Sequence, residues 1–155
     1  MVDKIVIGAE APDAADVVAL LETHLAFANE HSPSAHVHAL DLSGLMIPSI
    51  TFCAARRNGE LLGVGALRDL GGGRFEVKSM HTAAAARGLG VGRRMLGHLV
   101  GLATERGGTW VGLETGTMAA VAPARRLYET AGFETCAPFG TYTDNPFSVC
   151  YSRTL

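Results

Sequence analysis

The spacing of apolar residues changes along this chain, and each change marks a different kind of secondary structure. In the first half, an apolar repeat at helical spacing gives way to runs of β character, of which 74–82 alternates between two faces as a strand does. The turn signals Asn58-Gly59 and 71–73 separate these runs, which therefore predict antiparallel hairpins. The expected elements of this half are a strand at 4–7, a helix from 12 to about 29, a short helix at about 39–45 within a loop, and strands at 50–55, 61–67 and 74–82.

The second half places a glycine-rich turn and a helix between two strands. Apolar residues recur at helical spacing from Met95 to Ala103, and Gly107-Gly108 ends this helix. The remaining expected elements are a strand at 110–115, a helix over about 119–131, and strands near 133 and at 147–151. A β-α-β unit has parallel strands, whereas the hairpins before it are antiparallel. The sequence therefore predicts one α/β domain over 1–155, with a mixed, mostly antiparallel sheet flanked by helices.

Composition narrows the class of protein further. A chain of 155 residues fits one domain, and none of its apolar runs approaches the roughly 18 residues of a membrane-spanning helix. The N-terminus lacks the pattern of an export signal, and a net charge of −2 argues against nucleic acid or an anionic membrane as partner. Three widely spaced cysteines, Cys53, Cys136 and Cys150, form no Cys-x-x-Cys pair. We therefore expect reduced thiols and a cytoplasmic location.

The glycine-rich turn is the strongest candidate for a ligand site. Glycines allow a close approach of backbone N–H groups, and the helix N-terminus that follows attracts anions such as pyrophosphate. Arg87, Arg93 and Arg94 add local positive charge. A nucleotide triphosphate loop needs a Lys after Gly92, and a dinucleotide fingerprint needs a third glycine where Arg93 or Met95 stands, so both spacings fail. The remaining alternative is a structural turn with solvated arginines.

Three segments, 76–82, 87–92 and 127–133, together resemble the GNAT family of N-acetyltransferases. The segment 87–92 matches its Gln/Arg-x-x-Gly-x-Gly/Ala motif, and 127–133 matches Leu-Tyr-x-x-x-Gly-Phe. The resemblance implies a parallel β-α-β acyl-CoA-binding unit and acetyl-CoA as co-substrate, with no permanently bound cofactor. The implied CoA-binding residues are Met80, His81, Thr82, Arg87, Gly88, Leu89, Gly90, Val91, Gly92 and Arg93. The sequence departs from the family at Val121, where an Asn is common.

The implied reaction is direct attack of an amine on acetyl-CoA in a ternary complex. Tyr128 stands where the family has its general acid, and a phenol can protonate the leaving thiolate; the alternative is a core aromatic residue. Glu76, Glu114 and His81 are candidates for the general base, each of which can instead be structural, and a water relay can also serve. Cys150 fits packing in the last strand better than nucleophilic catalysis.

The loop before the first hairpin carries further candidates. A His-x-His pair without a third ligand at firm spacing is weak evidence for a metal, so no metal site is expected. The family uses this region to cover the acceptor site, which makes it a candidate for acceptor contacts. The candidate contacts are His36, His38, residues 40–45 and, on a late loop, Tyr142. Gly97 and Gly101 within a helix predict close packing at those positions.

Two functions follow from these residues. The first is an N-acetyltransferase acting on an amine of a small molecule or peptide, and the second is a non-catalytic acyl-CoA-binding regulatory module of the same fold. Tyr128 favours the enzyme, whereas the missing Asn at position 121 favours the module. The sequence leaves the identity of the acceptor and the oligomeric state open, although a homodimer is common for such domains.

Overall fold

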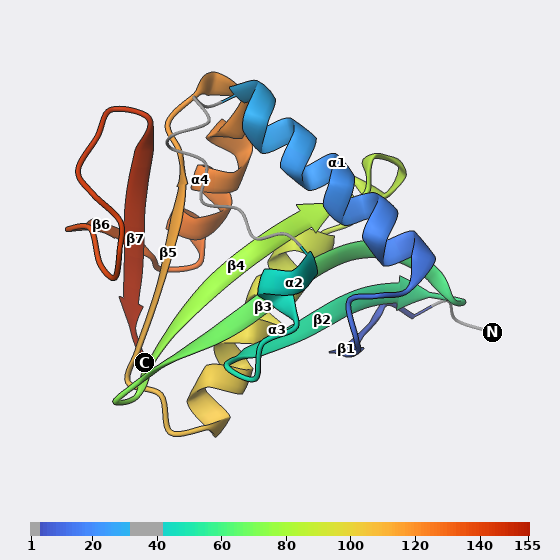
Figure 1. Ribbon diagram of the computed structural model, residues 1–155, viewed down its shortest axis with the longest axis horizontal. Coiled ribbons are helices and arrows are strands. Elements are labelled where there is room, and N and C mark those ends of the chain that lie inside the picture. The colour runs from blue at the N-terminus through green and yellow to red at the C-terminus, as the bar shows by residue number, and fades with distance from the viewer. Residues whose placement is uncertain (1–3, 32–41) are drawn as a thin grey trace.

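A seven-stranded sheet organises the computed structural model, which describes residues 4–31 and 42–155 (Figure 1). The strands are β1 (Val6–Ala9), β2 (Ile50–Arg57), β3 (Glu60–Gly71), β4 (Arg74–Thr82), β5 (Trp110–Gly116), β6 (Glu134–Cys136) and β7 (Ser148–Thr154). Their order in the sheet is β1-β2-β3-β4-β5-β7-β6, and all neighbours are antiparallel except the parallel pair β4 and β5. The predicted mixed sheet is confirmed.

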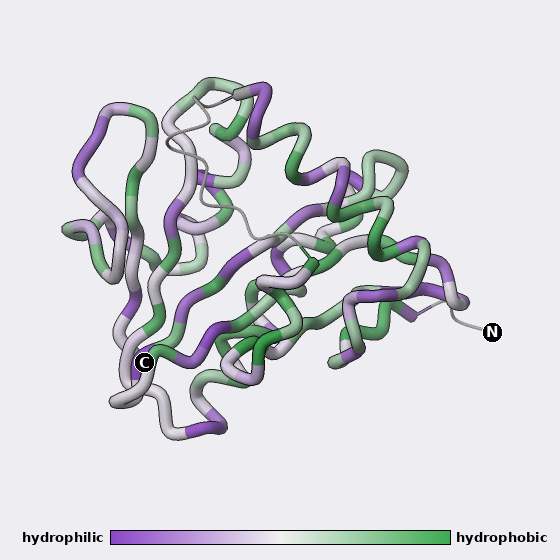
Figure 2. The backbone as a smooth tube through the Cα atoms, in the orientation of Figure 1, coloured by the Kyte–Doolittle hydropathy of each residue, from purple (hydrophilic) through white to green (hydrophobic). Residues whose placement is uncertain are grey.

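Helices cover both faces of this sheet. They are α1 (Ala15–His31), α2 (Leu42–Leu45), α3 (Val91–Glu105) and α4 (Ala122–Thr130), with single 3₁₀ turns η2 (Ala84–Ala86) and η3 (Ala119–Val121). Figure 1 shows α1 and α2 in front of the sheet and α3 behind it. Along α1, polar and apolar positions alternate in the tube of Figure 2, as expected for a helix with one face on the sheet.

Two apolar clusters hold these layers together. The larger lies between the sheet and the helices α3 and α4, and includes Met95, Leu99 and Phe75. The smaller lies under α1 and α2 and includes Val17 and Leu45. Complete burial of each such side chain contributes about 1.5–3 kcal/mol, so both faces stabilise the sheet.

Helix α3 packs closely on the sheet at Gly65 of β3, and not at the expected Gly97 and Gly101. A Cβ atom on Gly65 of β3 would lie 2.8 Å from Met95 Cγ, whereas nothing lies within 4 Å of a Cβ at Gly97 or Gly101. The expectation of close packing at the two helical glycines is therefore wrong. They lie on the side of α3 away from the sheet, and the strand glycine makes the close approach.

Several element boundaries also differ from the sequence prediction: α1 begins at Ala15 rather than 12, β3 extends to Gly71 and β7 to Thr154. Two further differences have a local cause. The first strand is β1 at Val6–Ala9 rather than 4–7, because its register is set by pairing with β2, with Gly8 opposite Ala54. The last helix begins with the 3₁₀ turn η3 and becomes α-helical only at Ala122. Pro123 occupies its first turn, where a missing N–H is tolerated.

Strand β4 has two irregularities, which open the sheet where a ligand could enter. The register against β3 shifts between Val64 and Ala66, so that Ser79 and Met80 both lie opposite Gly65 in a β-bulge. On its other side, β4 pairs with β5 only from Arg74 to Glu76. Beyond Glu76 the two strands diverge, as Figure 1 shows, and the sheet is open between them.

Candidate active site

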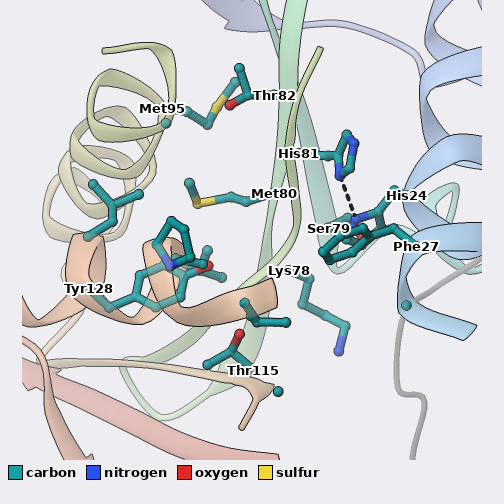
Figure 3. A pocket seen from close by; sticks show the side chains of 18 of the residues that line it. His24, Phe27, Lys78, Ser79, Met80, His81, Thr82, Met95, Thr115 and Tyr128 are labelled. Atoms are coloured by element: carbon teal, nitrogen blue, oxygen red, sulfur yellow. Dashed lines mark hydrogen bonds between the residues drawn. The ribbon is translucent and has the colours of Figure 1, made fainter. Parts of the chain in front are cut away.

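A cleft of about 460 Å³ occupies the region where β4 and β5 diverge (Figure 3). Its walls come from segments far apart in the sequence: α1, β3, β4, β5, α3, the segment that leads into α4, α4 itself and the loop that carries Tyr142. Figure 3 shows Tyr128 and Met95 on one side of β4, and His24, Phe27 and Lys78 on the other. The cleft therefore has two halves, which we call the loop half and the α1 half.

The loop half is built by the glycine turn between β4 and α3. Gly88 and Gly90 have φ angles of +83° and +76°, which L side chains rarely adopt, and Gly90 is the N-cap of α3. The first backbone N–H groups of a helix have no intrahelical partners and attract anions. Gly92 lets α4 approach, since a Cβ there would lie 3.3 Å from Leu127 Cδ2. This geometry suits a phosphate group.

The structure distributes the ten expected CoA-binding residues between the cleft and its rim. Six of them line the cleft: Met80, His81, Thr82, Arg87, Val91 and Gly92. The other four belong to the turn and the first turn of α3, and they do not line the cleft: Gly88, Leu89, Gly90 and Arg93. An extended ligand lying along β4 and leaving over the turn would contact both groups.

Tyr128 of α4 lies in the loop half, buried between the rings of Phe133 and Tyr151, each 6.2 Å away between centroids. It lines the cleft. Burial, together with the nearby charge of Glu114, raises the pKa of Tyr128 to about 12. The hydroxyl group therefore stays protonated at neutral pH and can act as a proton donor.

The entrance to α4 forms an apolar wall of the cleft. Ala120, Val121, Pro123 and Ala124 all line it. No side chain among these four can form a hydrogen bond, so nothing replaces the Asn that the resemblance leads one to expect at position 121. A ligand passing this wall would make apolar contacts or hydrogen bonds to the backbone.

A buried polar cluster forms the floor of the α1 half. Lys78 Nζ lies 3.3 Å from Glu76 Oε2 and donates to the Tyr142 hydroxyl oxygen at 2.8 Å, and that hydroxyl group donates to Glu76 Oε2. The side chains of Glu76 and Lys78 are only 5% and 8% exposed. Burial, followed by the charge of Glu76, raises the pKa of Tyr142. Glu76 Oε2 thus accepts hydrogen bonds from two donors.

A histidine pair joins α1 to β4 at the side of this floor. His24 Nδ1 and His81 Nδ1 are 3.2 Å apart, a hydrogen bond that requires one donor and one acceptor nitrogen (Figure 3). Phe27 packs edge-on against His81 at 6.3 Å between centroids. Burial and the neighbouring imidazole lower the pKa of His24 to about 4, and burial with Arg87 lowers that of His81. Both rings are neutral at pH 7.

Glu114 of β5 lines the cleft opposite β4. Its register partner on β7 is Cys150, which is buried and whose thiol has a pKa raised to about 11 by burial. A thiol with so high a pKa carries little thiolate, so Cys150 fits packing rather than nucleophilic attack. The four expected catalytic residues, Tyr128, Glu76, His81 and Glu114, therefore all line or border the same cleft.

Sequence reasoning missed four residues of the α1 half: His24, Phe27, Lys78 and Ser79. Lys78 could have been found, because it stands two residues after Glu76 and strand alternation places both on one face. Nothing in the sequence pairs His24 with His81, since the contact depends on how α1 crosses the sheet. Tyr142, expected to contact the acceptor, does border the cleft.

Some expectations fall outside the part of the chain that the structure describes. His36, His38 and the first two residues of 40–45 lie there, whereas Leu42–Leu45 forms α2. Within residues 4–31 and 42–155, no three His, Cys, Asp or Glu side chains are grouped to hold a metal ion. In the same ranges, no helix is long and apolar enough to span a membrane.

A splayed parallel pair with a glycine turn at a helix N-terminus fits the acyl-CoA-binding unit that the resemblance implies. The Acetyltransferase (GNAT) family matches residues 18–133. One relative is a Bacillus subtilis protein named uncharacterized N-acetyltransferase YsnE, which is 42% identical over 90% of this chain and 92% of its own length. Another is the IAA acetyltransferase of Azospirillum brasilense, which is 37% identical over 98% of this chain and 99% of its own length. The crystal structure of a Klebsiella pneumoniae protein assigned as an acyl-CoA N-acyltransferase is similar, with 30% identity, a TM-score of 0.81 and 97% of each chain covered.

The chain thus belongs to the GNAT acetyltransferase family, and the resemblance inferred from its three motifs is confirmed. It is a CoA-binding acetyltransferase by that membership. The family match covers most of α1, the glycine turn and α4, and it ends before Tyr142.

Proposed function

We propose that this protein transfers the acetyl group of acetyl-CoA to a primary amine of a small molecule or peptide, by direct attack in a ternary complex. The observation that carries the proposal is the cleft between β4 and β5, which has an anion-attracting loop half and a polar α1 half. Acetyl-CoA would lie along β4 with its pyrophosphate on the backbone amides of the glycine turn. The amine would enter from the α1 half.

The chemistry divides between the two halves. The amine nitrogen attacks the thioester carbonyl carbon, a C–N bond forms, and the C–S bond breaks. Tyr128 gives its proton to the departing sulfur, which leaves as the free thiol of CoA. The proton lost by the amine passes to a base in the α1 half, and the tyrosinate is reprotonated from solvent.

Geometry ranks the three candidates for the base. Glu76 Oε2 already accepts hydrogen bonds from Lys78 and Tyr142, so this oxygen is less available to take up a proton. Glu114 faces the gap from β5, and neutral His81 has a free Nε2 lone pair in the tautomer in which its Nδ1–H donates to His24. These two residues are therefore the better proton acceptors, and Glu76 has a positioning role.

The apolar entrance to α4 supports one alternative, a non-catalytic acyl-CoA-binding module. The wall of Ala120, Val121 and Pro123 offers no side-chain hydrogen bond to the pantetheine arm. A module of this kind would bind CoA and release no thiol from acetyl-CoA when amines are supplied. Detection of free CoA thiol separates the two functions.

Thermal unfolding with ligands tests the proposal. At 100 times its dissociation constant, CoA should stabilise the fold by about 2.7 kcal/mol, a rise in Tm of roughly 5–10 °C for a chain of this size. NAD and ATP should give smaller shifts at equal concentration, because their phosphates would occupy only part of the site. Equal shifts with all three ligands would contradict a CoA site.

Two glycine variants sharpen this measurement. Gly90→Val should abolish the CoA shift, because φ is +76° at this N-cap and a β-branched residue would distort the turn. Gly59→Val is the matched control, since Gly59 has a φ of +80° and open space around it in the β2–β3 turn. The control should lower Tm but keep the CoA shift.

A further inference from the structure

Ser79 occupies a backbone conformation that favours glycine. Its φ angle is +56°, and it lies in the β-bulge where β4 presents two residues opposite Gly65. An L side chain in this region is strained, whereas glycine adopts it freely. The backbone of the bulge therefore does not require a serine, and keeping a side chain there lowers stability.

The hydroxyl group of Ser79 adds a second cost. Its oxygen is buried and has no hydrogen-bond partner among residues 4–31 and 42–155. A buried polar atom without a partner loses its hydrogen bonds to water and gains none in return. Both costs belong to the side chain, and Gly at position 79 would remove both of them.

The position of Ser79 indicates what the side chain is for. It lines the cleft, and Figure 3 places it in the α1 half, beside His24 and Phe27 and across β4 from Tyr128. A serine hydroxyl can both donate and accept a hydrogen bond, which suits a polar group next to a reacting amine. The loop half, where CoA would bind, lies on the other side of the strand.

We propose that Ser79 is a substrate-contacting residue, whose hydroxyl group hydrogen-bonds a polar group of the amine acceptor and so fixes the acceptor in the α1 half. This inference rests on the proposed acetyl transfer. Binding of the acceptor supplies the partner that the hydroxyl group lacks within the described part of the chain. The buried hydroxyl group, which destabilises the unliganded protein, is then hydrogen-bonded in the ternary complex.

Two variants separate this role from a structural one. Ser79→Ala removes the hydroxyl group and keeps the strained φ, and Ser79→Gly removes both. Each should raise Tm above that of the wild type, with Gly above Ala. Each should also raise the acceptor KM about tenfold, the effect of one lost hydrogen bond, and leave the acetyl-CoA KM within about twofold.

Ser148→Ala is the matched control for these variants. Ser148 Oγ accepts a hydrogen bond from Asn145 Nδ2 at 3.0 Å, and Ser148 does not line the cleft. Its replacement should lower Tm and leave both KM values unchanged. The probe acceptors are glycinamide, phenethylamine and putrescine, with KM measured for the amine that the wild type acetylates fastest.

The outcomes decide between the two proposals. A lower Tm for Ser79→Ala, or an unchanged acceptor KM in both variants, overturns the role of Ser79 while the acetyl transfer stands. If none of the three amines is acetylated, the Tm of Ser79→Ala still decides, because a rise supports a hydroxyl group without a partner and a fall overturns it. Absence of any CoA-induced rise in wild-type Tm overturns the proposed function itself.

Discussion

The two halves of the cleft differ in how far main chain or side chains form them. The loop half combines Tyr128 of α4 with main chain at its anion-attracting end, where the glycine turn has φ angles of +83° and +76° and leads into the N-terminus of α3. The α1 half is made of side chains from α1, β4, β5 and the loop 137–147. A main-chain site tolerates most substitutions that keep its φ angles, whereas a side-chain site changes with each substitution. The first suits a constant ligand such as acetyl-CoA, and the second an acceptor that differs between proteins.

Charge separates the halves as well. The loop half has Arg87 and the positive end of a helix, which fit a pyrophosphate. The α1 half has the carboxylates of Glu76 and Glu114, one buried lysine and two neutral imidazoles. In a protein with a net charge of −2, both charge patterns are therefore local. Variants that change the properties of one half of the cleft and leave those of the other unchanged test this division into two halves.

The largest effect should come from Tyr128→Phe. The change keeps the buried ring but removes the proton donor, so kcat should fall by about 10²–10⁴-fold while acetyl-CoA affinity stays near that of the wild type. Steady-state kinetics and CoA titration measure the two quantities separately. A variant that retains more than about half of the wild-type kcat would remove Tyr128 from the mechanism.

The next largest effect should come from Lys78→Met in the α1 half. It leaves the buried carboxylate of Glu76 without its cation, which should lower the free energy of unfolding by about 3–5 kcal/mol. Urea unfolding measures this loss, and CoA affinity of the folded protein should stay within about twofold. The double variant Lys78→Met with Glu76→Gln should recover part of the stability. If the losses of unfolding free energy in the two single variants simply add up in the double variant, Lys78 and Glu76 do not stabilise each other.

The smallest of these effects concerns pH and the histidine pair. The pKa of His24 is about 4 in the folded protein and about 6.5 when unfolded, so the folded state binds fewer protons between these values. Above pH 6.5 His24 is neutral in both states and does not lower the free energy of unfolding. As the pH falls from 6.5 toward 4, the free energy of unfolding decreases by about 3 kcal/mol, because only the unfolded state takes up the proton. His81 and Arg87 are the titratable and charged groups associated with this pair.

His24→Phe isolates that contribution. The variant keeps a ring against Phe27 and His81 but cannot take up a proton. Its free energy of unfolding, measured in urea between pH 7 and pH 5, should fall less than that of the wild type. An equal fall in both proteins would show that His24 is not the group protected from protonation.

The loop half could be predicted from the sequence because its signals are local. The strand Arg74–Thr82 was predicted with its full bounds, and the glycine turn after it has positive φ angles at Gly88 and Gly90, which glycine adopts freely. The parallel pairing of β4 and β5 followed from the β-α-β order. These features depend on residues close together in the chain.

The α1 half could be predicted only in part, because its contacts are tertiary. Glu76 was found within a motif and Glu114 on the next parallel strand, but the meeting of His24 with His81 joins residues 57 positions apart. The bulge at Ser79 depends on the register between β3 and β4, which alternation alone does not specify. The register of β1 likewise depends on its partner strand.

A crystal structure of the protein with CoA and an amine product tests the two-half account most directly. The account predicts the pyrophosphate on the backbone amides of 88–92 and the CoA sulfur within about 3–3.5 Å of the Tyr128 hydroxyl group. The product should lie in the α1 half, beside His81 and Ser79. Both ligands on the same side of β4, or a sulfur remote from Tyr128, would contradict it.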